Sequence, residues 1–155
     1  GGGAASLPGP GGGGGNYGGG AEDGTPPGFN GLGGNVYGGD FTQKLLLGSG
    51  GGGAMGCYAG RCAWTGEGSP GARGGGIVAV FSNIIDNRGE IKAGGNDNTN
   101  PAISVYGGAG SGGSLMVKTN SFLNQGAISA NGGLSSNGIF GRGGNGGAGR
   151  TSITP

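Results

Sequence analysis

The chain has 155 residues, of which 50 are glycine, and its 8 basic and 7 acidic side chains leave a net charge of +1. Glycine normally makes up roughly 7% of a soluble protein, so an average globular domain is excluded, and collagen is excluded because the glycines follow no three-residue period. The balanced charge gives no basic patch for nucleic acid, and no apolar run approaches the roughly 20 residues that cross a bilayer.

The first predicted element is residues 1–40, which contain almost only glycine with some proline, asparagine and a few aromatic residues. Such a segment cannot bury a core alone. It is predicted to be either a flexible linker or a set of threefold polyglycine-II rods, which pack side by side where side chains are absent. The start of the chain shows neither an initiator Met nor a signal-peptide pattern, so we expect a removed leader or a fragment.

The next feature is the segment CYAGRC, in which four residues separate Cys57 from Cys62. A local disulfide across this loop is sterically feasible and fits an oxidising compartment. Free thiols are the alternative reading, whereas a zinc site would need four ligands and the chain has no histidine. We therefore predict a Cys57–Cys62 disulfide and a location in the secreted, cell-surface or virion-surface space.

An internal repeat follows, because residues 71–95 align without a gap on residues 108–132, 37 positions later, with 11 of 25 residues identical. Besides five glycines, the matched pairs are Ala72/Ala109, Val80/Val117, Asn83/Asn120, Asn87/Asn124, Ile91/Ile128 and Ala93/Ala130. A fixed period of this size is typical of stacked or solenoid architectures. The expected repeat domain, 41–155, comprises units 71–107 and 108–146, a partial unit 147–155 and a weaker upstream unit at about 38–70.

Each repeat has a strand-like pattern. Branched residues dominate 77–81 and 115–117, and the alternation in 89–93 and 126–130 places Ile and Ala on one face. No window without a glycine cluster shows helical periodicity. The sequence predicts an all-β fold without substantial helix, either a glycine-rich β-solenoid or stacked β-sheets, with polyglycine-II-like segments.

The asparagine pairs Asn83/Asn120 and Asn87/Asn124 have two structural interpretations. They form hydrogen-bonded ladders between successive units, or they are turn residues. Another polar group, Asp86 and Asp97 with Asn96 and Asn98, offers oxygen ligands for calcium, but its spacing matches no calcium loop, so no cofactor is predicted.

Aromatic residues are the best candidates for contact with a partner, because they lie in glycine-rich stretches where little else covers them. The candidates are Tyr58, Trp64 and Tyr106. The alternative is that they fill gaps between packed rods.

The unit GGG-[IV]-x-V-x-[ST]-N, followed by N-x-G-x-I-x-A-x-G, resembles the glycine-rich repeats of large bacterial surface and adhesin-like proteins of the parallel β-helix type. The polyglycine runs broken by variable segments are similar to those of the glycine-rich adhesins at phage tail-fibre tips. Both resemblances imply display on a surface and binding or assembly through repeats.

Enzymatic function is not expected, since the acidic residues are scattered, histidine is absent and no phosphate-binding GK[ST] motif occurs. The leading hypothesis is an extracellular protein that assembles with copies of itself into a filament, sheath or coat through glycine-rich faces and strand edges. The alternative is an adhesin or phage tail-tip protein that contacts a cell-surface glycan or protein. Ice binding is a third hypothesis, although repeated Thr-x-Thr ranks are missing.

Overall fold

The computed structural model describes residues 44–53, 70–99, 107–135 and 143–155, and these residues form strands and no helix. The strands are β1 (Ile77–Asn87), β2 (Glu90–Lys92), β3 (Ser114–Asn124), β4 (Ala127–Ser129) and β5 (Arg150–Thr154). The expected all-β class is confirmed for this part of the chain. The described ranges contain no helix that could cross a membrane.

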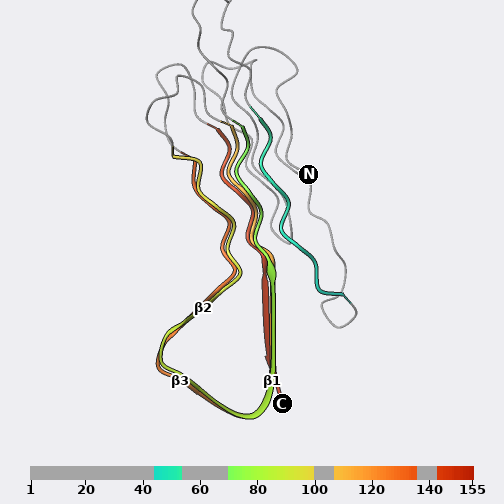
Figure 1. The fold of residues 1–155 in the computed structure, drawn as a ribbon, viewed down its shortest axis with the longest axis vertical. Coiled ribbons are helices and arrows are strands. Elements are labelled where there is room, and N and C mark those ends of the chain that lie inside the picture. The colour runs from blue at the N-terminus through green and yellow to red at the C-terminus, as the bar shows by residue number, and fades with distance from the viewer. Residues whose placement is uncertain (1–43, 54–69, 100–106, 136–142) are drawn as a thin grey trace, which may run out of the picture.

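The strands pair in parallel, in a three-stranded sheet of order β1-β3-β5 and a two-stranded sheet of β2 and β4. Val80 lies opposite Val117, and Ile91 lies opposite Ile128, so the strands pair at the same 37-residue offset as the repeat. Val117 lies opposite Ile153, an offset of 36. Figure 1 shows the consequence: successive units follow nearly the same path and lie one on another.

Three layers result, and they are defined here by their described residues: layer 1 is 70–99, layer 2 is 107–135 and layer 3 is 143–155. In layers 1 and 2 the long strand runs down one side and bends at the bottom, and after a further turn the chain returns along the short strand (Figure 1). The short bridge between Asn98 and Ser135 continues the same parallel pairing beyond β2 and β4.

The apolar core lies between the two sheets. Leu115 and Val117 of β3 are fully buried, while Lys118 between Val117 and Thr119 is exposed, as the period of two along a strand requires. Ala93 and Ala130, which follow β2 and β4, complete the buried cluster. Partly buried side chains surround it: Val78, Val80, Ile85, Ile91, Phe122 and Ile128.

Above the strands, the glycine-rich segments are joined by backbone hydrogen bonds that recur every three residues. Segments 48–52, 71–75 and 107–113 bond to one another in a closed ring. The amides of Gly48 and Gly51 donate to the carbonyl oxygens of Gly75 and Ala72. The amides of Gly75 and Ala72 donate in turn to Ser111 and Gly108, and those of Ser111 and Gly108 donate to Ser49 and Gly52. The N···O distances are 2.7 to 3.0 Å. This spacing differs from the two-residue spacing of a β-ladder.

Segment 107–113, named the central segment here, bonds to five surrounding segments. These neighbours are 48–52, 71–75, 93–98, 130–135 and 144–149. Every residue of the central segment is buried. A Cβ added at Gly110 would fall against the carbonyl oxygen of Arg73, so glycine is required here for close approach of two backbones.

Residues 44–53 form no strand; they run antiparallel to residues 72–75 and to the central segment. Leu46 exchanges two hydrogen bonds with the Ser114 hydroxyl, at 2.9 and 2.8 Å, which fixes this segment at the start of β3. The expected upstream unit at 38–70 is only partly described, and the segment 1–40 lies outside the described residues.

Candidate assembly surfaces

The four asparagines of the repeat lie in two pairs along the stacking direction. The Asn87 Nδ2 donates a hydrogen bond of 2.7 Å to the Asn124 Oδ1, and the Asn120 Nδ2 lies 3.4 Å from the Asn83 Oδ1. These are the contacts expected of an asparagine ladder. Asn87 is also a turn residue, because its Oδ1 accepts a hydrogen bond from the Gly89 amide. Asn87 therefore fits both interpretations, the ladder and the turn.

Asp86 and Asp97, the acidic residues among the possible calcium ligands, bind different partners. The Asp86 carboxylate pairs with Arg88 at 2.7 Å beside the turn, whereas the Asp97 Oδ1 accepts a hydrogen bond of 2.7 Å from the Leu134 amide. The described residues contain no group of three acidic, histidine or cysteine side chains suited to a metal ion.

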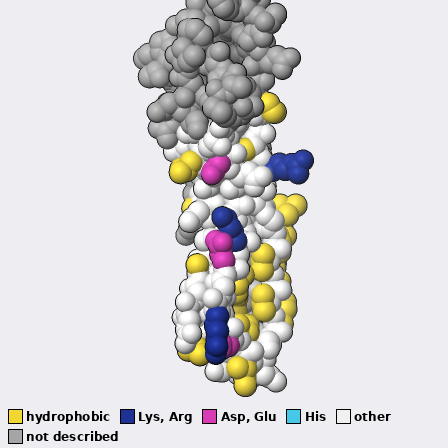
Figure 2. All heavy atoms as spheres, turned by 60° about the vertical axis from the view of Figure 1, so that its left-hand side comes forward, with side chains coloured by type: hydrophobic (Ala, Val, Ile, Leu, Met, Phe, Trp, Pro, Cys, Tyr) yellow, Lys and Arg dark blue, Asp and Glu magenta, His cyan; other side chains and the backbone are white. Residues whose placement is uncertain are grey.

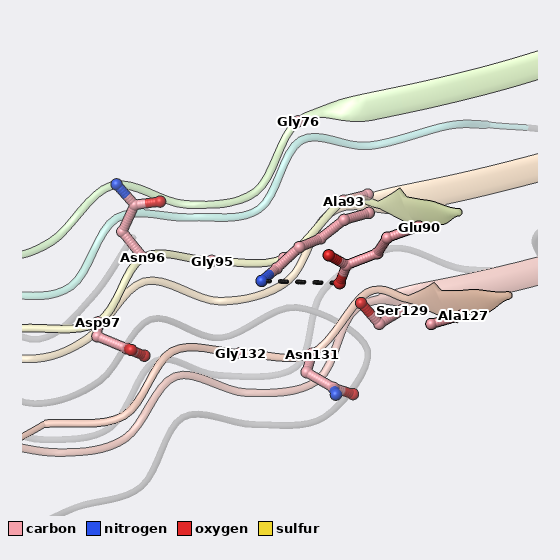
Figure 3. Close-up of a pocket in the computed structure, with 12 residues that line it drawn as sticks. Gly76, Glu90, Ala93, Gly95, Asn96, Asp97, Ala127, Ser129, Asn131 and Gly132 are labelled. Carbon is pink, nitrogen blue, oxygen red and sulfur yellow. Dashed lines mark ion pairs between the residues drawn. The ribbon is translucent and has the colours of Figure 1, made fainter. Parts of the chain in front are cut away.

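A polar groove of about 760 Å³ lies between the outer face of β2 and β4 and the glycine-rich segments (Figure 3). Its charged side chains include Glu90, Lys92 and Asp97, and Asn96 and Asn131 line it as well. The Lys92 Nζ lies 3.9 Å from the Glu90 Oε1, and both side chains are more than half exposed. An ion pair this long and exposed contributes little to stability.

Among the described residues, no strand pairs with the outer edge of layer 1, and its apolar side chains are incompletely covered. Within the described residues β1 pairs with β3 alone, and β2 pairs with β4 alone. Val78 and Val80 are only partly buried, although their neighbours one layer further in, Leu115 and Val117, are fully buried. Figure 2 shows hydrophobic side chains running along one side of the strand-bearing half of the molecule.

Other apolar side chains of β1 are exposed on its outer face, away from the core that Val78 and Val80 line. Phe81 is 66% exposed and Ile84 is 73% exposed, and Ile77 at the start of the strand is 43% exposed. Several large apolar side chains this exposed on one strand are typical of surfaces that contact another chain.

Layer 3 presents a second open edge at the opposite end of the stack. β5 pairs with β3 on one side, and no described strand lies on its other side. Ile153 points to the same face as the buried Val117 but is 45% exposed. The repeat in the sequence relates Val80 to Val117 and Ile91 to Ile128, but it does not indicate which of these residues stand at an end of the stack.

At the far end of the glycine-rich segments, a hydrogen-bond cluster joins the boundaries of the described ranges. The Asn98 Nδ2 donates to the carbonyl oxygens of Pro70 and Gly107, at 2.8 and 3.1 Å, and the Ser135 hydroxyl donates to Gly107 at 3.3 Å. We call this the connecting end. The chain therefore leaves and re-enters the described structure around segments 54–69, 100–106 and 136–142 at one end of the molecule.

Asn98 and Ser135 lie outside the aligned repeat, yet they are 37 residues apart and form the bridge. Continuing the 37-residue offset past residue 95 would have found this pair. Cys57 and Cys62, together with the contact candidates Tyr58, Trp64 and Tyr106, lie outside the described residues.

The chain matches no protein-family model, no curated protein and no solved structure.

Proposed function

We propose that the chain is an extracellular structural protein whose layers are coils of a glycine-rich β-solenoid, with its glycine segments in the polyglycine-II conformation. The parallel pairing at offsets of 36 and 37 residues supports the solenoid. Hydrogen bonds that recur every three residues support polyglycine-II, because a threefold helix presents its amides in the same direction once per turn.

The function of this solenoid is self-assembly into a filament, sheath or surface coat. One observation carries the proposal: the stack has an apolar end that no described segment covers, with Val78, Val80, Ile85 and Ile91 only partly buried on layer 1. Repeat proteins that stay monomeric need terminal units with a polar outer face. A strand edge with no described neighbour, beside partly buried apolar side chains, is instead a template for another chain.

The charge of the molecule is compatible with close association of copies. The net charge is only +1, and the segment Ile77–Ile85 contains no charged residue. Copies therefore meet at this surface without strong mutual repulsion.

Electron microscopy and analytical ultracentrifugation of the purified chain over a wide concentration range test the proposal. We expect elongated or sheet-like particles whose size distribution shifts upward with concentration. A monomer that persists at the highest concentration would contradict self-assembly.

A second candidate function, adhesion, is favoured by the connecting end. Pro70, Asn98, Gly107 and Ser135 lie together there, so boundaries of the described ranges meet at one end of the glycine-rich body. Binding residues are often carried on segments that a rigid scaffold positions. Such an adhesin would contact a cell-surface glycan or protein.

Deletion of residues 57–65, and separately of residues 100–105, tests adhesion. Residues 96–99 are retained in both variants because the Asn98 side chain donates hydrogen bonds to Pro70 and Gly107. We expect loss of cell binding with an unchanged circular dichroism spectrum. Cell binding that survives both deletions would rule out adhesion through these segments while leaving self-assembly unaffected.

A further inference from the structure

The geometry points to a head-to-tail polymer in which β5 of one copy pairs in parallel with β1 of the next copy. Arg150–Thr154 of the first copy lies opposite Ile77–Phe81 of the second. This inference rests on the proposed self-assembly and adds the identity of the two surfaces, the register of their pairing and the polarity of the polymer.

The backbone of both edge strands is oriented for this pairing. The Ser114 amide donates to the Gly76 carbonyl at 3.2 Å, and the Arg150 amide donates to the Gly113 carbonyl at 2.9 Å. In a parallel ladder, alternate residues bond to opposite neighbours. The backbone groups of Ile77, Ala79 and Phe81 therefore point away from β3, and so do those of Thr151 and Ile153 on the other side of the sheet.

The core-facing side chains of the two edges match the pairs already present inside the molecule. Within one copy, the row Val80, Val117 and Ile153 crosses all three strands, and the row Val78, Leu115 and Thr151 runs beside it. In the proposed contact, Val80 of the next copy covers Ile153, and Val78 covers Thr151. Cross-strand pairs of β-branched side chains stabilise a sheet, so each row continues with the residue types that it has inside.

The glycine-rich segments favour the parallel arrangement over a two-fold one. Segment 71–75 lies parallel to the central segment, and the central segment lies parallel to 144–149, through bonds such as Ala72 to Gly108 and Ala109 to Gly144. A head-to-tail contact places 71–75 of the next copy beside 144–149 in this same relation. A two-fold axis between two β1 strands would make them antiparallel and separate these segments.

Contacts between two different surfaces that do not close a ring generate open filaments. Each copy therefore adds its three layers to one end of a polar fibre. The proposed contact buries the open edge of layer 1 on one copy and the open edge of layer 3 on its neighbour.

Two proline variants test the inference. Ala79→Pro removes an outward amide of β1, and Thr151→Pro removes an outward amide of β5; neither amide bonds to β3 in the parallel ladder. Proline on the solvent side of an edge strand is compatible with the sheet. The matched controls, Ala79→Val and Thr151→Val, keep the amides and β-sheet-forming side chains. All four variants are first checked for the circular dichroism spectrum and melting temperature of the wild-type monomer.

Sedimentation of the two proline variants, alone and mixed, gives the decisive comparison. We expect each proline variant alone to be monomeric, both valine controls to polymerise, and an equimolar mixture to form a 1:1 dimer of about twice the 14.4 kDa chain mass. In that dimer, the free β5 edge of the Ala79→Pro chain meets the free β1 edge of the Thr151→Pro chain.

Several outcomes would overturn the inference. Dimers of one proline variant alone would indicate a two-fold contact through its intact edge. Polymers of both proline variants would place the contact away from these strands. If the wild-type chain assembles but the two proline variants form no mixed dimer, the head-to-tail register alone is refuted. If the wild-type chain never assembles, the proposed function is refuted as well.

Discussion

The glycines of this molecule differ in how closely other atoms approach the position that a Cβ atom would occupy. A Cβ at Gly110 would meet the Arg73 backbone, and one at Gly112 would meet the Ala130 carbonyl oxygen, whereas a Cβ at Gly76 would meet nothing within 4 Å. Backbone atoms cannot rotate away as a flexible side chain can. The glycines around the central segment are thus needed for packing, while Gly76 is not.

The substitution Gly110→Ala should destabilise the chain by about 1–3 kcal/mol or more, because the added methyl group overpacks a backbone contact. Gly76→Ala is the matched control, and it should change the free energy of unfolding by less than about 1 kcal/mol, in the stabilising direction through lower entropy of the unfolded chain. Urea titration of both variants measures the difference. Equal losses at the two positions would contradict the backbone-packing explanation.

The two rungs of the asparagine ladder should also differ. Asn87 is 8% exposed and its side chain makes hydrogen bonds to Asn124, Ala127 and Gly89, so Asn87→Ala should cost about 1–3 kcal/mol. Asn83→Ala removes an exposed contact of 3.4 Å, and we expect a loss below about 0.5 kcal/mol. Thermal unfolding with both variants at one chain concentration checks this order.

The strands show what a repeat in the sequence can predict. The matches Val80/Val117 and Ile91/Ile128 gave the pairing register, because residues at the same place in successive layers lie opposite each other. Val117 against Ile153 has an offset of 36, whereas the sequence predicts only that residues 147–155 form a partial unit. Five residues of β5 are too few to define a register from identities alone.

The arrangement of the glycine segments was not predictable from the sequence. Glycine matches between segments occur by composition, so they carry no register. Both 48–53 and the central segment contain only Gly, Ala and Ser, and nothing in this composition indicates which of the two becomes the centre. The long-range backbone hydrogen bonds of the folded chain determine which segment lies at the centre.

A pair of leucines tests the position of the core. Leu115 is fully buried on β3, and Leu134 is 61% exposed beside the connecting end. Leu115→Ala should cost about 2–5 kcal/mol, since it leaves a cavity between the sheets. Leu134→Ala should cost less than about 1 kcal/mol. Chemical denaturation of the two variants distinguishes them, and similar midpoints would show that β3 is not the centre of the core.

At the scale of the whole molecule, the proposed assembly contact depends on backbone hydrogen bonds and apolar side chains. The ion pairs Asp86–Arg88 and Glu90–Lys92 are exposed and lie outside Ile77–Phe81 and Arg150–Thr154. The polymer fraction should therefore change little between about 0.05 and 0.5 M sodium chloride, a range over which exposed charge pairs are strongly screened. Light scattering at fixed chain concentration measures it. Dissolution of the polymer by salt would indicate a charged contact instead.

The buried central segment has a consequence for local opening of the fold. Residues 107–113 have few apolar side-chain atoms, yet neighbouring backbones on many sides enclose them and bond to them. To exchange their amide hydrogens with solvent, these residues must part from several segments at once. The slowest hydrogen–deuterium exchange in the described chain should therefore occur in a stretch of glycine, alanine and serine, and not in the outer strand β1 with its many branched side chains.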